Sequence, residues 1–560
     1  MLSRRRIVTR LAAGTAVLGF AGLPIVMPVA PAGASQASPL SRAATAECLQ
    51  EITGSGSTWA QNAVDEWIGN VQQQGLQVVF TGNGSAEGRQ NFAEGTVDFA
   101  VSDVGYQGNN SEDGDDTSSR PYAYLPITAG GTAFPYNITV AGKRITNLRL
   151  SGKVLAEIFT LQITNWDNPQ ITADNNGHAL PSIPIITVVP SEGSGTTAMF
   201  TQYLSYEFPS LWTPFNDGDS GWTEFWPPDK GPSQIAQDGS PQVMNYIASK
   251  AAQGAIGIDE YSYPLAAGFP VVQMENAAGY YVLPTEYNDA VALTQAKLNM
   301  DKNSIDYLLQ NLDDVYGYTD PRTYPLSSYS YTIMPTSKTD SRMEVPAGQC
   351  PAKWQTLANF LKYSICRGQE YIGPIGYSAL PINLVEDGFA QIDKIKAAAP
   401  KVSIDQINVS NCENPTFIAG HPDENYLAKV APYPPACDKQ GEGPCTGTLN
   451  GNANGGKGSS TPVSSGSPSA SASSSASASA SASPSTSGDS GGSSNGGGTG
   501  QLTGTTASGQ VNPTAVSLPA GQSGVNDDVL YALAALLLLG VLAAPPLVAW
   551  LWSGARKRQL

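Results

Sequence analysis

The sequence predicts an α/β fold, because strand-like and helix-like segments alternate along the central part of the chain. Short apolar runs predict strands at 76–81, 97–101 and 185–189, and the segments 86–94 and 151–159 predict helices. Ligands of such folds bind at the carboxyl ends of strands, where loops lead into helix N-termini. A binding site is therefore expected in loops of this kind.

The two ends of the chain predict export and anchoring. Residues 1–34 begin with three arginines, continue through an apolar stretch and end in Ala-Gly-Ala, which is typical of a cleaved export signal. The basic start is compatible with general or twin-arginine export. Residues 529–552 carry no charge, and 24 residues are enough for a helix to cross a membrane. The basic tail at 553–560 then places the C-terminus in the cytoplasm and the rest of the mature chain outside the cell.

Two further segments lie between the folded body and this anchor. Residues 450–528 consist mainly of Gly, Ser, Ala, Thr and Pro, a composition that cannot build a core and that predicts a disordered stalk. The folded body is expected at 48–400, followed by a cysteine-containing extension at 401–449. The rival interpretation, a sortase signal, needs a Thr that Leu518-Pro519-Ala520-Gly521 lacks, so a transmembrane helix is favoured.

Six cysteines in an exported chain predict up to three disulfides. Fifteen pairings are possible, and the sequence alone does not choose among them. Cys437 and Cys445 are close enough to close a small loop, and a pairing of Cys350 with Cys366 is plausible.

Composition and missing motifs exclude several classes of function. The formal net charge is −17, and it is −21 without the first 34 residues, which hold four Arg and no acidic residue; nucleic acid is therefore not an expected partner. The chain has only two histidines and no Cys-x-x-Cys pair, so no metal site is expected. The folded body expected at 48–400 also lacks a Walker A lysine and a Gly-x-Ser-x-Gly elbow. No catalysis and no cofactor are predicted.

Three loops share a chemistry suited to an anion. The segments 53–59, 82–85 and 193–197 each combine glycines with hydroxyl side chains and precede a predicted helix. Glycines let backbone N–H groups approach a ligand, and a helix N-terminus favours negative charge. An ordinary helix cap after a tight turn would explain any one of these loops equally well.

Ordered segments of residues 50–390 resemble the phosphate-binding proteins that serve phosphate ABC transporters. The resemblance is carried by ITGSGSTW, EGTVDFAVSD (94–103), LPITAGGTAFPYNI (125–138), LRLSGKVLAEIF (148–159), ITNWDNP (163–169), ITVVPSEGSGTT (186–197), QGAIGIDEYSY (253–263) and YPLSSYSY (324–331). It implies a two-lobed periplasmic-binding-protein type II fold with two hinge crossings, near 128–136 and 324–331. One lobe would comprise residues 48–128 and 325–400, and the other residues 129–324.

The same resemblance implies the site and the function. The residues that it would place on a phosphate ion are Thr58, the backbone N–H of Trp59, Ser85, Asp103, Ser194, the backbone N–H of Gly195 and Thr196. Asp103 would accept the proton of the phosphate, which selects a protonated anion over sulfate. The implied protein is a monomer that captures inorganic phosphate for an ABC permease. The alternative is a non-enzymatic surface interaction or sensing protein with weak or altered anion binding.

One position departs from the family pattern Arg-x-Asp-Gly-Ser-Gly-Thr. Pro190 replaces the Arg and Glu192 replaces the Asp, so the cationic ligand of the pattern is absent. Arg89 and Arg120 are the substitutes considered, although an exposed structural role is favoured for each. We therefore expect weaker phosphate binding than is usual for the family.

Overall fold

The computed structural model describes residues 48–111, 114–404, 409, 412–421 and 423–445. The predicted export signal, stalk, transmembrane helix and basic tail all lie outside these residues. Within the described part of the chain, no helix combines the length and the apolar character needed to cross a membrane.

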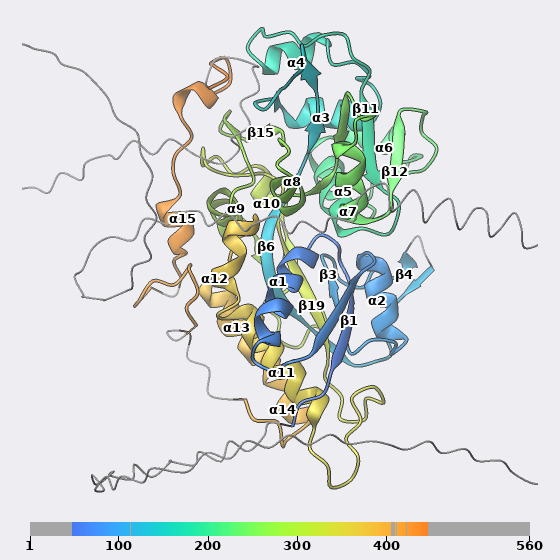
Figure 1. The fold of residues 1–560 in the computed structure, drawn as a ribbon, viewed down its shortest axis with the longest axis vertical. Coiled ribbons are helices and arrows are strands. Elements are labelled where there is room, and N and C mark those ends of the chain that lie inside the picture. Colours follow the sequence, from blue (N-terminus) through green and yellow to red (C-terminus); the bar gives the residue numbers. More distant parts are fainter. Residues whose placement is uncertain (1–47, 112–113, 405–408, 410–411, 422, 446–560) are drawn as a thin grey trace, which may run out of the picture. The chain divides into compact units, whose positions relative to one another are not determined.

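The first sheet has six strands in the order β14-β6-β19-β3-β1-β2 (Figure 1). The strand β1 (Ile52–Gly56) pairs in parallel with β2 (Val78–Gly82) and with β3 (Phe99–Ser102). The helix α1 (Gln61–Gln72) follows β1, and α2 (Ser85–Ala93) follows β2. The strands predicted at 76–81 and 97–101 and the helix predicted at 86–94 are thus confirmed with small shifts of their bounds. We call the elements packed around this sheet the first half.

The second sheet has four strands in the order β12-β11-β13-β7. The strand β11 (Ile186–Pro190) lies between β12 (Gln234–Gln237) and β13 (Ala255–Gly257), and β7 is Tyr136–Asn137. The strand predicted at 185–189 is therefore confirmed as β11. The main helices beside this second sheet are α3 (Gly152–Phe159), α5 (Gly195–Glu207), α6 (Pro209–Phe215) and α7 (Gly239–Ala248). Helix α3 confirms the prediction at 151–159. We call the elements around this sheet the second half.

Two long strands run through the centre of the first sheet and lead toward the second half. The strand β6 (Tyr122–Ala133) pairs antiparallel with β19 (Ser327–Pro335) along nearly their whole lengths. Every residue of β19 is buried, including the serines and the threonine that alternate with Tyr329, Tyr331 and Ile333. β14 (Asp259–Glu260) closes the sheet edge against the end of β6. Other helices of the first half are α11 (Ala352–Ile365), α12 (Gln369–Ile372), α13 (Ile382–Ile392) and α14 (Lys394–Ala398).

The described cysteines form three disulfides, Cys48–Cys350, Cys366–Cys412 and Cys437–Cys445. The predicted loop closed by Cys437 and Cys445 is confirmed, and the suggested pairing of Cys350 with Cys366 is wrong. Helix α11 fills the sequence between those two cysteines and separates them by roughly 20 Å, at 1.5 Å per residue. A disulfide requires Cα atoms within about 7 Å.

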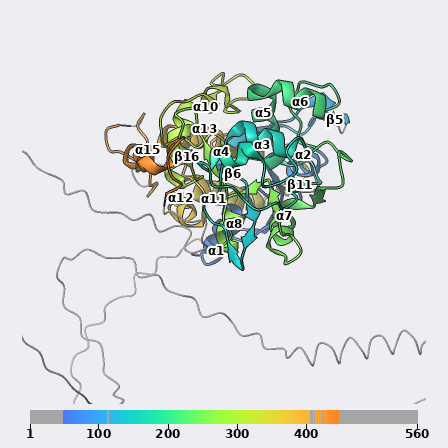
Figure 2. The ribbon, with the colours of Figure 1, turned by 90° about the horizontal axis from the view of Figure 1, so that it is seen from above.

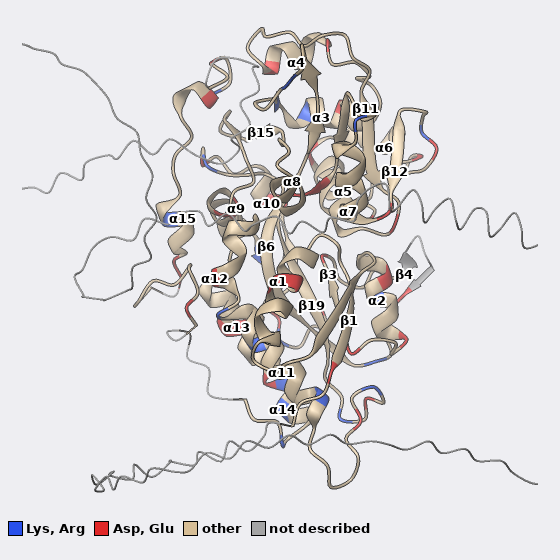
Figure 3. Cartoon of the chain, in the orientation of Figure 1, with Lys and Arg blue, Asp and Glu red and all other residues tan. Residues whose placement is uncertain are grey.

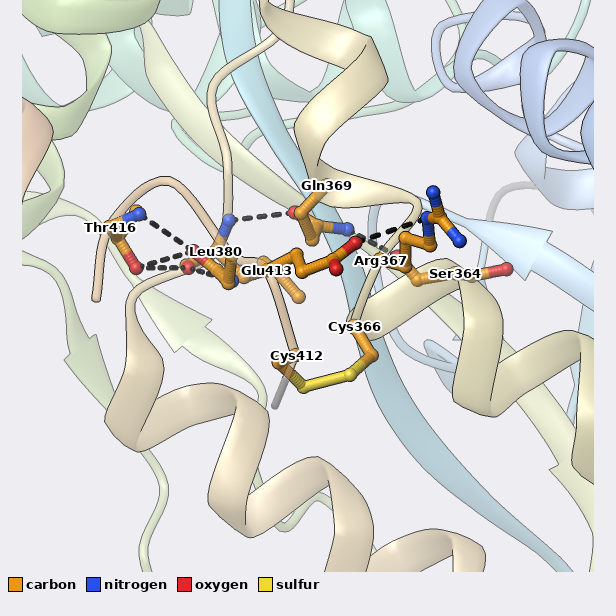
Figure 4. Close-up of a disulfide and its surroundings, with 9 residues drawn as sticks. Ser364, Cys366, Arg367, Gln369, Leu380, Cys412, Glu413 and Thr416 are labelled. Atoms are coloured by element: carbon orange, nitrogen blue, oxygen red, sulfur yellow. Dashed lines mark hydrogen bonds and ion pairs between the residues drawn. A yellow bond between two sulfur atoms is a disulfide. The ribbon is translucent and has the colours of Figure 1, made fainter. Parts of the chain in front are cut away.

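The described residues after position 400 are part of the folded body. Cys412 is bonded to Cys366 at the end of α11, and the Thr416 hydroxyl beside it donates to the carbonyl oxygen of Leu380 at 2.9 Å (Figure 4). Further along, α15 (Tyr426–Val430) packs on α9 (Glu286–Ala292), at the edge away from α5 and α7 (Figure 2). Beyond α15 the extension reaches the second half, where Asp438 pairs with the buried Arg149 at 3.0 Å. The extension therefore contacts both halves.

Removal of the Cys366–Cys412 disulfide should lower the free energy of unfolding by about 2 to 4 kcal/mol. The bond joins residues 46 positions apart, so its loss restores much conformational freedom to the unfolded chain. Urea unfolding of the full-length chain with both cysteines changed to serine measures the effect. The matched control changes Cys437 and Cys445, which are only 8 positions apart, and should lose less. An equal or larger loss in the control would contradict the expectation.

Candidate anion-binding site

The first predicted loop lies between β1 and α1. Gly56 has a φ of +138°, and a Cβ there would overlap the carbonyl oxygen of Val101 on the neighbouring strand, so only glycine fits. The next residue, Ser57, donates its hydroxyl to Oδ2 of Asp103 at 2.7 Å. The Thr58 hydroxyl lies 3.5 Å from that of Ser240, at the start of α7, and accepts the Ser240 backbone N–H at 3.3 Å. This loop of the first half therefore touches the second half directly.

The second predicted loop places Ser85 at the N-terminus of α2. Its hydroxyl donates to Oδ2 of Asp103 at 3.0 Å, so Ser57 and Ser85 hold the same carboxylate oxygen. The next backbone N–H, that of Ala86, donates across to the carbonyl oxygen of Gly193 at 3.1 Å. The second and third loops are thus joined by a backbone hydrogen bond.

The third predicted loop leads from β11 into α5. Ser194 caps the helix by accepting the Thr196 backbone N–H at 3.2 Å. Gly195 lies against Asp103 so closely that a Cβ on it would be 2.5 Å from the Cβ of Asp103 and nearer still to the carboxylate. The hydroxyls of Thr196 and Thr197 are buried and find no hydrogen-bond partner among the described residues. They are donors available to a buried ligand.

Asp103 stands where the three loops meet. Its side chain is 1% exposed, and burial raises the pKa of its carboxyl. The hydroxyls of Ser330, Ser57 and Ser85 lower the pKa and so oppose that rise. The Ser330 hydroxyl makes no hydrogen bond to a described residue. Its second oxygen, Oδ1, accepts no hydrogen bond within the described part of the chain. A buried acceptor without a donor suits a ligand that brings a proton.

The charges around the site are mainly acidic. Pro190 ends β11, and the Glu192 carboxylate accepts the backbone N–H groups of Gly239 and Ser191 at 2.9 and 3.1 Å. Burial raises the pKa of Glu192 and of the fully buried Asp259. Elsewhere, acidic and basic residues are interspersed along the described elements (Figure 3).

The two arginines considered as substitutes are not exposed, which corrects that expectation. Arg89 is fully buried and pairs with Asp116 at 3.0 Å and with Glu224. The side chain of Arg120 is 9% exposed and pairs with Asp340 at 2.6 Å. Each arginine sits beside polar neighbours in sequence, and only the packing of distant segments shows that it is enclosed.

The structure therefore brings together most of the residues that were predicted as ligands. Ser85, Asp103 and Gly195 are in direct proximity, Thr58 lies against α7, and Ser194 and Thr196 form the first turn of α5. Trp59 is buried, with its carbonyl oxygen accepting the Tyr377 hydroxyl at 2.7 Å. Sequence reasoning missed Ser57, Ser240 and Glu224. Only Ser57 had a local signal, because it belongs to the first glycine-rich loop.

The chain is similar in sequence to several known proteins. A family model described as the PBP superfamily domain matches residues 34–367. The phosphate-binding protein PstS of Methanocaldococcus jannaschii is 28% identical over 351 residues, which are 62% of this chain and 86% of that protein. The phosphate-binding protein PstS 3 of Mycobacterium tuberculosis is 28% identical over 375 residues, or 66% and 93% of the two chains.

Solved structures of similar proteins were also found. A high-affinity periplasmic phosphate-binding protein, PfluDING, bound with phosphate, aligns with a TM-score of 0.49 at 18% identity, covering 64% of this chain and 100% of that one. A phosphate-binding protein from Stenotrophomonas maltophilia aligns with a TM-score of 0.46 at 15% identity, covering 63% and 99%.

Proposed function

Because the chain belongs to the PBP superfamily, and its relatives are named as phosphate-binding proteins, we propose that it is an exported solute-binding protein that captures inorganic phosphate for an ABC permease. It is proposed to act as a monomer and without catalysis. The match covers 86% of the first relative and 93% of the second, and this near-complete overlap supports the proposal.

The observation that carries the proposal is the meeting of three glycine and hydroxyl loops at one buried carboxylate. An oxyanion that leaves water needs many donors, and the loops offer hydroxyls, backbone N–H groups and helix N-termini. One acceptor among them favours an anion that carries a proton. The proposed ligands are Thr58, Trp59, Ser85, Asp103, Ser194, Gly195 and Thr196. Ser57 is proposed to orient Asp103.

We further propose that the two halves are lobes that close on the ligand. The proposed lobes comprise residues 48–128 with 325–400, and residues 129–324, with β6 and β19 as the crossings. The bond from Ala86 to Gly193 and the contact of Thr58 with Ser240 support a closed arrangement of these lobes in the described structure. Opening would break both.

Titration calorimetry of the full-length chain with phosphate, arsenate and sulfate tests the function. Phosphate and arsenate carry a proton near neutral pH and should both bind, whereas sulfate should not. Absence of binding for all three anions would instead favour the alternative, a surface interaction or sensing protein.

Replacement of Pro190 with arginine should tighten phosphate binding by about ten- to a hundredfold, because a charged hydrogen bond contributes roughly 1.5 to 3 kcal/mol. The half-buried Glu192 carboxylate nearby can orient the new guanidinium. Calorimetry measures the change, with Pro190→Gln as the control that removes proline without adding charge. The expectation fails if the two variants bind phosphate equally.

The place of the protein in the cell is also proposed. Export through residues 1–34 and anchoring through the uncharged segment 529–552 would hold the binding domain outside the membrane. Deletion of residues 529–560 should then release the protein into the medium, as cell fractionation and immunoblotting would show. Retention of the deleted protein on membranes would reveal a different anchor.

A further inference from the structure

A buried ion pair connects the two halves beside the proposed site. Arg89 lies on α2 of the first half and is 0% exposed, and Glu224 lies between α6 and β12 of the second half and is 4% exposed. Nη2 of Arg89 donates to Oε1 of Glu224. The pair therefore exists only while the two halves are together.

Hydrogen bonds to three residues of the first half fix the position of Arg89. Its Nε donates to Asp116 at 3.0 Å, and its Nη1 donates to the Ser102 hydroxyl at 3.0 Å, one residue before Asp103. Its backbone carbonyl oxygen accepts the Tyr106 hydroxyl at 2.8 Å. These contacts aim the remaining nitrogen, Nη2, across the boundary toward Glu224.

Glu224 is tied in turn to the third loop. Its backbone carbonyl oxygen accepts the N–H of Ser194 at 2.9 Å, so it fixes the residue that caps α5. The neighbouring residue Thr223 donates its backbone N–H to the Thr201 hydroxyl of α5 at 3.1 Å. Arg89 itself is one helical turn after Ser85 on α2. The ion pair thus links the helix of Ser85 to the cap of Ser194.

The charge balance favours a closed pair. Glu224 and Asp116 raise the pKa of Arg89, against the opposing effect of burial, so the guanidinium stays charged. Breaking one contact of a buried ion pair is disfavoured until the halves have separated far enough for water to reach both charges. Truncation of one partner in such a pair mainly speeds dissociation.

We infer that Arg89 and Glu224 form a latch between the halves that positions Ser85 and Ser194 on one oxyanion and slows its release. The inference rests on the proposed function for the identity of the anion. Arg89 would thereby act on the site from the first half without touching the ligand, through the placement of the two serines rather than through its charge, which two carboxylates neutralise. Both latch residues are positioning residues.

The test compares Glu224→Gln with the wild type, using the full-length chain. Release of radiolabelled phosphate, followed by rapid filtration, should be about tenfold faster or more, while the association rate changes by less than about twofold. Hydrogen exchange of the phosphate-free protein should rise in peptides that cover residues 191–200. Arg89→Lys keeps the positive charge but has one ammonium group in place of the several N–H donors of arginine. Its release rate and its exchange at 191–200 should lie between those of the wild type and those of Glu224→Gln.

The matched control is Asp340→Asn, which breaks the Arg120–Asp340 pair, a buried pair contained within the first half. It should lower the thermal midpoint without faster release and without more exchange at 191–200. Equal release and exchange in Glu224→Gln and the wild type would overturn the latch, as would changes equal to those of the control. If the wild type binds no phosphate, the proposed function fails, and the exchange measurement alone still decides whether the latch exists.

Discussion

Replacing Gly195 with alanine should weaken phosphate binding by about a hundredfold or more while leaving the protein folded. The added methyl group would overlap the carboxylate of Asp103, which belongs to the opposite half. In a separated arrangement of the halves the same methyl group meets no such neighbour, and alanine is a better helix former than glycine. The substitution should therefore block closure and spare each half.

Calorimetry with phosphate and thermal unfolding without phosphate measure the two parts of this expectation. Gly317→Ala is the matched control, because a Cβ at that position meets no atom within 4 Å. It should change neither measurement appreciably. Wild-type affinity in Gly195→Ala would show that the ligand does not require the observed approach of Gly195 to Asp103.

Replacing Asp103 with asparagine should weaken phosphate binding by about ten- to a hundredfold and relax the exclusion of sulfate. The carboxylate offers a charged acceptor for the phosphate proton, and a charged hydrogen bond contributes roughly 1.5 to 3 kcal/mol. The amide is a weaker acceptor, and its NH₂ group can donate to an anion without a proton. Because burial raises the pKa of Asp103, removal of the charge should not lower the stability of the phosphate-free protein.

Paired titrations with phosphate and sulfate, together with urea unfolding, measure these effects. Asp98→Asn is the control, since Asp98 is a fully buried carboxylate that pairs with Lys353 at 2.7 Å and Arg342 at 3.0 Å. It should lose stability without any gain in sulfate binding. Unchanged phosphate affinity in Asp103→Asn would remove Asp103 from the site.

Much of the local structure was predictable because it depends on neighbours in sequence. The apolar run at 185–189 forms β11, since a strand buried on both faces needs a continuous apolar pattern. The serine at 194 caps α5, because its hydroxyl reaches a backbone N–H two residues away. Elements, loops and the residue types suited to an anion could therefore be predicted from periodicity, capping and composition.

Only the tertiary structure decided which of these loops meet and how the charges pair. Cys366 bonds to Cys412 rather than to Cys350, because a helix stands between the two residues that are nearer in sequence. Arg89 and Glu224, 135 positions apart, become neighbours when the two halves come together. Such pairings depend on the register and packing of whole elements, and no local pattern of residues encodes them. The sequence alone therefore determined the local elements and the donor chemistry of the loops, and packing decided that these loops meet at Asp103 and that Arg89 pairs with Glu224.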